Sequence, residues 1–162
     1  MNIGIVGQGF VGTAVNEGLK PKFNVETYDI AKESSCSSLE EICNKSDILF
    51  ICLPTPMNPN GSCSTLTVQK VLKEINDLNT CNTIVIKSTI PPGITEVWNK
   101  RYNNIQIVFN PEFLTEANSI EDFKNQNRII VGGPRPASTK VARVFKKAFP
   151  KVPIIKTGST HA

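Results

Sequence analysis

The chain has 162 residues, of which 40% are hydrophobic and 20% are charged, and its formal net charge is +4. A chain of this length and composition typically forms one globular domain with a buried core. No apolar run approaches the ~18 residues of a membrane-spanning helix, and no secretory signal is visible, so we expect a cytoplasmic protein without membrane contact.

Cysteine and histidine usage argues against a metal site. Five cysteines occur without a C-x-x-C pair, and His161 is the single histidine, so we expect free thiols, a reducing compartment and no metal. The segment from Arg135 onward holds seven lysines and arginines and no acidic residue. Such a segment can meet nucleic acid, but a solvated helix face is the interpretation we favour, so no nucleic-acid partner is expected.

The first predicted element is an apolar strand that ends in a G-x-G-x-x-G turn at Gly7, Gly9 and Gly12. An amphipathic helix follows, with Val11 and Leu19 on its apolar face. Between a strand and a helix, such a turn presents backbone N–H groups and the positive end of a helix dipole, which hold a phosphate. Gly7 permits the turn, Gly9 admits a pyrophosphate to the backbone, and Gly12 lets the helix pack closely.

The next strand ends at Asp29, about 20 residues beyond the glycines. A carboxylate at this position accepts hydrogen bonds from both ribose hydroxyls and repels a 2′-phosphate. The sequence therefore predicts NAD rather than NADP as the ligand. The alternative is a glycine turn without a ligand, with Asp29 as an ordinary residue at the end of a strand.

The remaining elements continue the alternation of strand and helix. We expect strands at residues 47–53, 83–87, 105–109, 128–132 and 152–156, and helices at residues 39–45, 66–78 and 137–149, with a further helix that turns Val97 and Trp98 inward. Short connections and apolar strands are typical of a doubly wound α/β domain with a parallel sheet, the Rossmann fold. We expect a single domain over residues 1–162.

Polar segments follow five of these strands. They are Gly7–Gly12, Asp29, Pro54-Thr55-Pro56, Ser88-Thr89 and residues 110–116. Because ligands of such sheets bind outside the carboxyl ends of the strands, we expect the five segments to share one crevice.

The side chains at these ends allow two interpretations. Thr55, Ser88 and Thr89 can donate to a ribose, to the nicotinamide amide or to a substrate oxygen, but the same residue types also satisfy turns and caps. Glu112 or Glu116, placed near a bound nicotinamide, can serve as a base. Alternatively, Glu116 stabilises the first turn of a helix and Glu112 is simply solvated.

The motifs together resemble one family. They read G-Q-G-F-V-G at 7–12, C-L-P-T-P at 52–56, K-S-T-I-P-P-G at 87–93, N-P-E-F-L-T-E at 110–116 and N-R-I-I-V-G-G at 127–133. Over nearly its whole length the chain resembles the N-terminal NAD-binding domain of the UDP-glucose/GDP-mannose dehydrogenase family. The N-P-E-F-L-x-E segment is the most specific element of the resemblance.

The resemblance implies an enzyme that oxidises the C6 alcohol of a nucleotide sugar to a carboxylate with two NAD⁺, by way of an aldehyde and a cysteine thioester. It implies that Gly7, Gly9, Phe10, Val11 and Gly12 hold the pyrophosphate, that Asp29 holds the adenosine ribose, and that Leu53, Pro54, Thr55, Ser88 and Glu116 contact the cofactor. Thr89 positions a catalytic water and Glu112 is the base of the hydrolysis step. Phe113, Leu114, Thr115 and Glu116 contact the sugar nucleotide, for which UDP-glucose is the expected identity.

The chain departs from the family pattern in several places. Lys32 stands where members often have an arginine, Thr115 also replaces an arginine, and Ser64 replaces an acid. None of the five cysteines lies in the G-F-G-G-x-C-type motif that carries the family's nucleophile. The sequence therefore predicts the NAD-binding part of the enzyme without its central helix and C-terminal nucleotide-sugar domain, and predicts that this part is inactive alone.

Two other functional classes remain open. One is a fragment of a different dehydrogenase, of the β-hydroxyacid type, although such a protein has no need of N-P-E-F-L-x-E. The other is a non-catalytic NAD-binding module. The expected partners of the chain itself are a nucleotide-sugar substrate and either a second copy of the chain or a second chain that carries the missing half.

Overall fold

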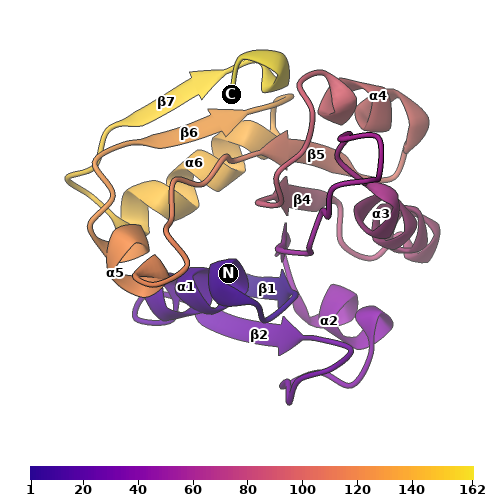
Figure 1. Cartoon of the computed structure of the whole chain (residues 1–162). Helices are drawn as coiled ribbons and strands as arrows, with labels where there is room; N and C mark the ends of the chain where they lie inside the picture. The colour runs from indigo at the N-terminus through magenta and orange to yellow at the C-terminus, as the bar shows by residue number, and fades with distance from the viewer.

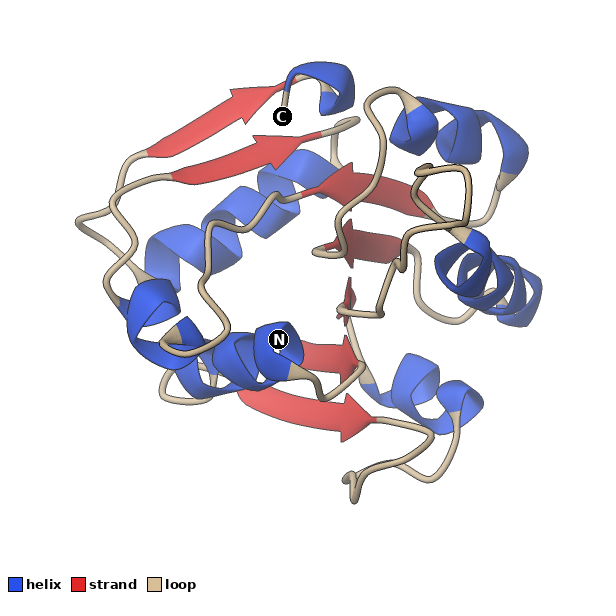
Figure 2. Cartoon of the chain, viewed as in Figure 1, coloured by secondary structure: helices blue, strands red, loops and turns tan.

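A seven-stranded sheet forms the centre of the computed structural model, which describes residues 1–162 (Figures 1 and 2). The strands are β1 (Asn2–Val6), β2 (Asn24–Tyr28), β3 (Ile48–Ile51), β4 (Thr83–Ile86), β5 (Gln106–Phe109), β6 (Ile129–Gly132) and β7 (Ile154–Thr157). Their spatial order is β2-β1-β3-β4-β5-β6-β7. The strands β1 to β5 are mutually parallel, which confirms the doubly wound α/β fold.

The helices cover both faces of the sheet. They are α1 (Phe10–Leu19), α2 (Leu39–Lys45), α3 (Leu66–Leu78), α4 (Ile94–Arg101), α5 (Ser119–Lys124) and α6 (Ala137–Ala148), with a final 3₁₀ turn, η1 (Ser159–His161). Figure 1 shows α2, α3 and α4 on one side and α1, α5 and α6 on the other. None of these helices is both long enough and apolar enough to cross a bilayer.

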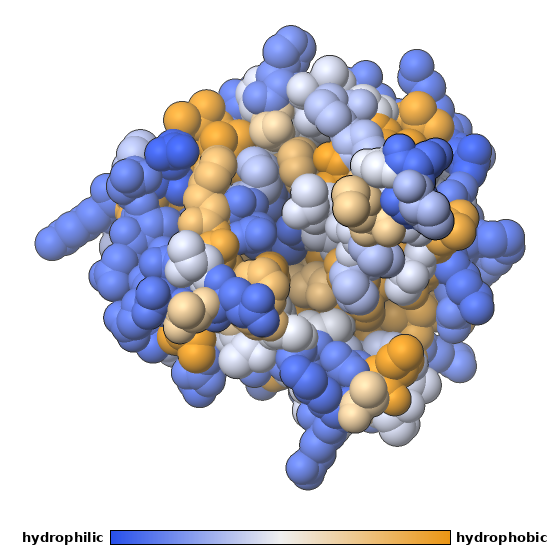
Figure 3. Space-filling model, viewed as in Figure 1, coloured by the Kyte–Doolittle hydropathy of each residue, from blue (hydrophilic) through white to orange (hydrophobic).

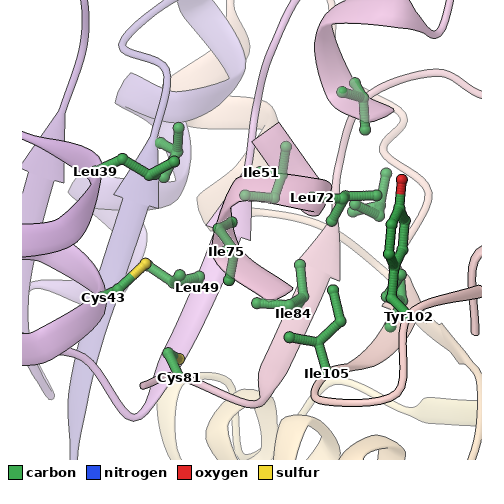
Figure 4. Packing of buried hydrophobic residues seen from close by; sticks show 14 of the residues in the cluster. Leu39, Cys43, Leu49, Ile51, Leu72, Ile75, Cys81, Ile84, Tyr102 and Ile105 are labelled. Atoms are coloured by element: carbon green, nitrogen blue, oxygen red, sulfur yellow. The ribbon is translucent and has the colours of Figure 1, made fainter. Parts of the chain in front are cut away.

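Each face of the sheet has its own hydrophobic core. Within β3, Leu49 and Ile51 point into the core beneath α2 to α4, whereas Ile48 and Phe50 point into the core beneath α1, α5 and α6. All four side chains are fully buried, which explains the continuous apolar run of this strand. Figure 4 shows the first of these cores. Each such side chain contributes roughly 1.5–3 kcal/mol by leaving water.

The chain's local signals agree with the observed helix ends. The hydroxyl of Ser38 accepts a hydrogen bond from the backbone N–H of Glu41 at 3.0 Å and caps α2. The helix α3 ends at a residue in left-handed conformation, Asn79, with φ of 53°.

The strand β6 differs from the expected all-parallel sheet. It runs antiparallel to β5 and pairs with it only through Phe109 and Gly132, while β7 is parallel to β6. A parallel return needs a crossover helix that carries the chain back across the sheet. The connection after β5 instead holds only the short helix α5, whose Phe123 packs beside α1, so the chain reverses beyond the end of β5.

Two further local features differ from expectation. The helix α5 is not among the elements expected from the sequence, because a helix of six residues is too short for periodicity to reveal. Of the two residues expected inward on α4, Trp98 is buried but Val97 is 47% exposed. Neighbouring residues on a helix point about 100° apart, and α4 turns Trp98 toward the core and Val97 toward solvent.

Candidate functional site

A cavity of about 870 Å³ opens at the carboxyl ends of the parallel strands. Its lining includes Gly7 and Gly9 after β1, Asp29 after β2, Leu53, Pro54 and Thr55 after β3, Ser88 and Thr89 after β4, and Glu112 after β5. The five expected strand ends therefore meet in one crevice. In the sheet, β2 lies on one side of β1 and β3 lies on the other. The crevice lies at this change of direction in the strand order, which is where such folds bind dinucleotides. In the space-filling view the centre of this face is hollowed and its rim is mostly hydrophilic (Figure 3).

The glycine turn has the geometry that a phosphate needs. Gly7 has φ of +96° and donates its N–H to the carbonyl of Tyr28 at 2.9 Å. A Cβ on Gly12 would overlap the carbonyl of Gly7, so only glycine lets α1 start this close to the turn. A Cβ on Gly9 would meet nothing within 4 Å, so packing within the protein does not explain that glycine. It lines the crevice, where added bulk would take ligand volume.

The N-terminus of α1 is open toward the crevice. No side chain caps this helix, and its first turn contains no acidic residue. Phe10 and Val11 from this turn also line the cavity, whereas Gly12 is buried behind them. The unsatisfied N–H groups and the helix dipole therefore leave an anion-binding position directly beside Gly9.

Asp29 is held by the backbone around it. One carboxylate oxygen accepts the N–H of Gln8 at 2.7 Å, and the other accepts the N–H groups of Ala31 at 2.8 Å and Lys32 at 3.1 Å. Partial desolvation acts to raise the pKa of Asp29, but these three hydrogen bonds and the charge of Lys32 outweigh it and lower the pKa. The carboxylate is thus fixed in its ionised form next to the glycine turn, where it can accept ribose hydroxyls.

The strand ends at β3 and β4 are tied together. The hydroxyl of Ser88 accepts the backbone N–H of Leu53 at 3.0 Å and lies 3.4 Å from the carbonyl of Ile51. Ser88 thus has a structural role while it also lines the crevice. Thr89 is exposed at the cavity wall, and its carbonyl accepts the thiol of Cys63 at 3.5 Å.

Glu112 reaches the crevice from the turn after β5. Its carboxylate accepts the N–H of Leu114 at 2.7 Å, and its side chain is half-buried. Beneath it, Lys87 is 3% exposed and donates from Nζ to Oδ1 of Asn110 at 3.0 Å. Burial lowers the pKa of Lys87 to about 8, while the nearby Cys52 and Glu112 act in the opposite direction.

The segment after Glu112 lies outside the cavity lining. Phe113 is 57% exposed and stacks 4.5 Å from the guanidinium of Arg128. Leu114 packs partly on the core beneath α1, α5 and α6. The backbone N–H and hydroxyl of Thr115 donate to Asp122 at 2.8 and 2.6 Å. Glu116 is exposed. The structure does not bring these four residues to the cofactor crevice, and their contact with a sugar nucleotide stays a prediction.

Several residues of the crevice were not predicted from the sequence. They are Lys87, Tyr28 and, on the wall formed by α3, Lys70 and Glu74. Lys32, which the sequence had already singled out, lines the crevice as well. The amine of Lys32 donates to the carbonyl of Gln8 at 2.7 Å and so closes over the glycine turn. Lys87 left a detectable signal, because a lysine directly at the end of a fully buried strand is costly unless it has a role.

The thiols of the chain are free, and no group of three or more His, Cys, Asp or Glu side chains is placed to hold a metal ion. Cys52, the cysteine that lines the crevice, is buried at the end of β3. Burial raises the pKa of its thiol to about 12. The thiolate form is therefore scarce near neutral pH, and this thiol should be unreactive.

Comparison with known proteins agrees with this geometry. Residues 30–149 match the model of the UDP-glucose/GDP-mannose dehydrogenase family, NAD binding domain. The chain is 30% identical over 138 residues to UDP-glucose 6-dehydrogenase of Campylobacter jejuni. The match covers 85% of this chain and 35% of that protein.

Solved structures show the same fold. A UDP-glucose dehydrogenase from Pyrobaculum islandicum superimposes with a TM-score of 0.87 at 23% identity, over 99% of this chain and 46% of that one. GDP-mannose dehydrogenase from Pseudomonas aeruginosa gives 0.85 at 19% identity, over 99% of this chain and 47% of that one. The chain thus spans about a third to a half of the length of these relatives. It belongs to the UDP-glucose/GDP-mannose dehydrogenase family, within which it corresponds to the NAD-binding domain, and its cofactor is NAD.

Proposed function

We propose that this chain is the NAD-binding part of a nucleotide-sugar dehydrogenase that oxidises UDP-glucose to the corresponding uronic acid. The observation that carries the proposal is the shared crevice. Its lining holds a phosphate turn and a ribose-binding carboxylate, Gly9 and Asp29, together with a hydroxyl and a second carboxylate, Thr89 and Glu112. A site that only stored a dinucleotide has no need of the second pair.

The cofactor half of the crevice is assigned first. Gly7, Gly9 and the first turn of α1 hold the pyrophosphate, and Asp29 accepts the hydroxyls of the adenosine ribose. The segment Leu53–Thr55 and Ser88 line the rest of the cofactor's path. When bound, NAD⁺ supplies the hydride acceptor, and the chain's own residues orient it.

The other half of the crevice is assigned to the substrate's chemistry. Thr89, exposed at the wall, positions a water molecule, and Glu112 accepts a proton from it. Phe113 to Glu116, which lie on the rim beyond the cavity, contact the sugar nucleotide. Because Thr115 is fastened to Asp122 on α5, this rim is anchored to the domain rather than free.

The thioester step of such an oxidation needs a reactive thiol, which these residues do not supply. Cys52 is the crevice cysteine, and its raised pKa makes it a poor nucleophile. We therefore infer that residues 1–162 bind NAD without turnover, and that the thiol comes from another part of the protein, a second copy or a second chain. The same observation favours one second candidate, a non-catalytic NAD-binding module.

Calorimetric titration with nucleotides and then with sugar nucleotides tests the proposal. We expect NAD⁺ to bind and NADP⁺ to bind more weakly, because Asp29 repels a 2′-phosphate. UDP-glucose should bind only weakly to the NAD⁺-loaded chain, because the nucleotide-sugar domain of the family is not among these residues. Failure of NAD⁺ to bind would contradict the proposal, and equal binding of NADP⁺ would contradict the assignment of Asp29.

A further inference from the structure

Lys87 is a buried amine that forms no salt bridge. Its Nζ donates to the neutral amide of Asn110 at 3.0 Å, and it lies 5.8 Å from the centre of the Phe123 ring. The amide of Asn110 in turn donates to the carbonyl of Ile130 at 2.6 Å, which fixes its oxygen toward the lysine. The three ion pairs of the structure lie elsewhere, at the surface of α1, α2 and α3. A buried ammonium that is satisfied in this way is costly, and packing alone does not explain it.

The surroundings of Lys87 leave both of its charge states accessible. Cys52 approaches from the end of β3, Glu112 from the turn after β5, and Phe123 from α5. Burial lowers the pKa of Lys87 to about 8, so that both forms are populated between neutral and mildly alkaline pH. Cys52, with a pKa raised to about 12, is uncharged over that range. The remaining neighbours, Asn110 and Phe123, do not titrate.

The position of Lys87 places it on the nicotinamide side of the crevice. Asp29 follows β2 and the glycine turn follows β1, so they mark the adenosine ribose and the pyrophosphate. The strand order β2-β1-β3-β4 then leaves the other half of an extended dinucleotide over β3 and β4. Lys87 and Ser88 stand at the end of β4, about two strand spacings or ~10 Å from β1, and both line the cavity.

The two redox forms of NAD differ in charge at this end. The oxidised nicotinamide ring carries a positive charge and the reduced ring is neutral. In a water-poor pocket an ammonium repels the first and tolerates the second. We propose that Lys87 couples the redox state of bound NAD to a proton: the neutral amine accompanies NAD⁺, and the protonated amine accompanies NADH.

This inference rests on the proposed placement of NAD in the crevice, and its consequence is a measurable proton. When NAD⁺ binds near neutral pH, Lys87 releases its proton to the solvent, and the amine's N–H bonding electrons remain on nitrogen as a lone pair. When NADH binds, the ammonium keeps its proton. The affinity for NAD⁺ should therefore rise about tenfold between pH 7 and pH 9, as the neutral fraction of the amine rises, whereas the affinity for NADH should not rise.

Calorimetry in two buffers of different ionisation enthalpy tests the coupling on the intact chain. For the unmodified protein at pH 7 we expect release of about 0.9 proton per NAD⁺ bound and almost none per NADH. In Lys87→Met, which is matched in length and uncharged, the release should vanish and the affinity for NAD⁺ should no longer depend on pH. Lys100→Met, a change at an exposed lysine of α4 outside the crevice, should behave as the unmodified protein.

A second variant keeps the inference testable if Lys87→Met does not fold. Arg is charged at every accessible pH, so Lys87→Arg should bind NAD⁺ at least tenfold more weakly than NADH, with no proton release. Binding of both forms by the unmodified protein without proton release would overturn the inference and leave the proposed function standing. Proton release that persists in Lys87→Met would also overturn it. Failure of the unmodified protein to bind either form would overturn the proposed function and this inference together.

Discussion

The two ends of the crevice present different kinds of chemical group. At the β1–β2 end, the crevice presents backbone groups: the turn at Gly7 and Gly9, the open N-terminus of α1, and an Asp29 carboxylate held by three backbone N–H groups. At the β4–β5 end, it presents side chains, among them Thr89, Glu112 and the buried Lys87. The first end is complete within this chain. The second presents a carboxylate, a hydroxyl and an amine but no reactive thiol.

This difference teaches which half of the function the chain can perform alone. Backbone groups at a glycine turn need no partner to bind a pyrophosphate. Side chains around a reacting carbon must be assembled from every part of the site, and one missing group stops the chemistry. Substitutions at the first end should therefore weaken or abolish binding, whereas substitutions of Thr89 or Glu112 at the second end should leave binding of the cofactor nearly unchanged. Lys87 is the exception at the second end, because its charge acts on the nicotinamide.

The largest effect is expected at Gly7. Gly7→Ala should be strained for two reasons. Gly7 has φ of +96°, and a Cβ at this position would overlap the carbonyl of Cys52. We expect a loss of about 3 kcal/mol of unfolding free energy and loss of NAD binding. Gly61→Ala is the matched control, because Gly61 has φ of +82° but open space around it, so the cost should be only about 1 kcal/mol. Urea denaturation compares the two, and equal losses would contradict the close packing at the turn.

The next effect concerns Asp29. Asp29→Ala removes a charged hydrogen-bond acceptor of the ribose and should weaken NAD⁺ binding by roughly 1–3 kcal/mol. Asp77→Ala, at an exposed carboxylate of α3 paired with Lys73, is the control and should leave the affinity unchanged. Calorimetric titration measures both. An unchanged affinity in the Asp29 variant would mean that the ribose is held by other groups.

A smaller effect should appear in acid. The folded-state pKa of Asp29 lies below the ordinary value of 3.8, so its contribution to stability is present above that pH and is lost as the pH falls through the folded-state pKa. Between about pH 6 and about pH 3 the thermal midpoint of the unmodified protein should therefore fall further than that of Asp29→Asn. Parallel falls in the two proteins would show that the backbone hydrogen bonds do not stabilise the carboxylate.

The smallest effect on cofactor affinity is expected at Glu112. Glu112→Gln keeps an oxygen that can accept the N–H of Leu114, so the turn should persist. The dissociation constant for NAD⁺ should change by less than about twofold, since the change lies beyond the groups that hold the cofactor. Fluorescence titration with NADH gives the dissociation constant of the reduced cofactor, independently of the titration with NAD⁺. A large loss of affinity would show that the two ends of the crevice are not separable.

The same division separates what the sequence could predict from what it could not. The glycine turn, Asp29 and the helices at residues 39–45 and 66–78 follow from spacing, caps and periodicity within short windows, and the structure confirms their geometry. The antiparallel course of β6 depends on where the chain after β5 goes, which no local pattern specifies. The burial of Lys87 and the outward course of Phe113 to Glu116 depend on contacts with Asn110, Arg128 and Asp122, which only the folded chain brings near.

Incubation of the purified chain with NAD⁺ and UDP-glucose, followed by near-ultraviolet absorbance of NADH, tests the division most directly. We predict that NAD⁺ binds to the chain and that no substrate-dependent NADH appears, because the crevice has its cofactor end but its one lining cysteine, Cys52, is not activated. Steady formation of NADH that depends on UDP-glucose would contradict it.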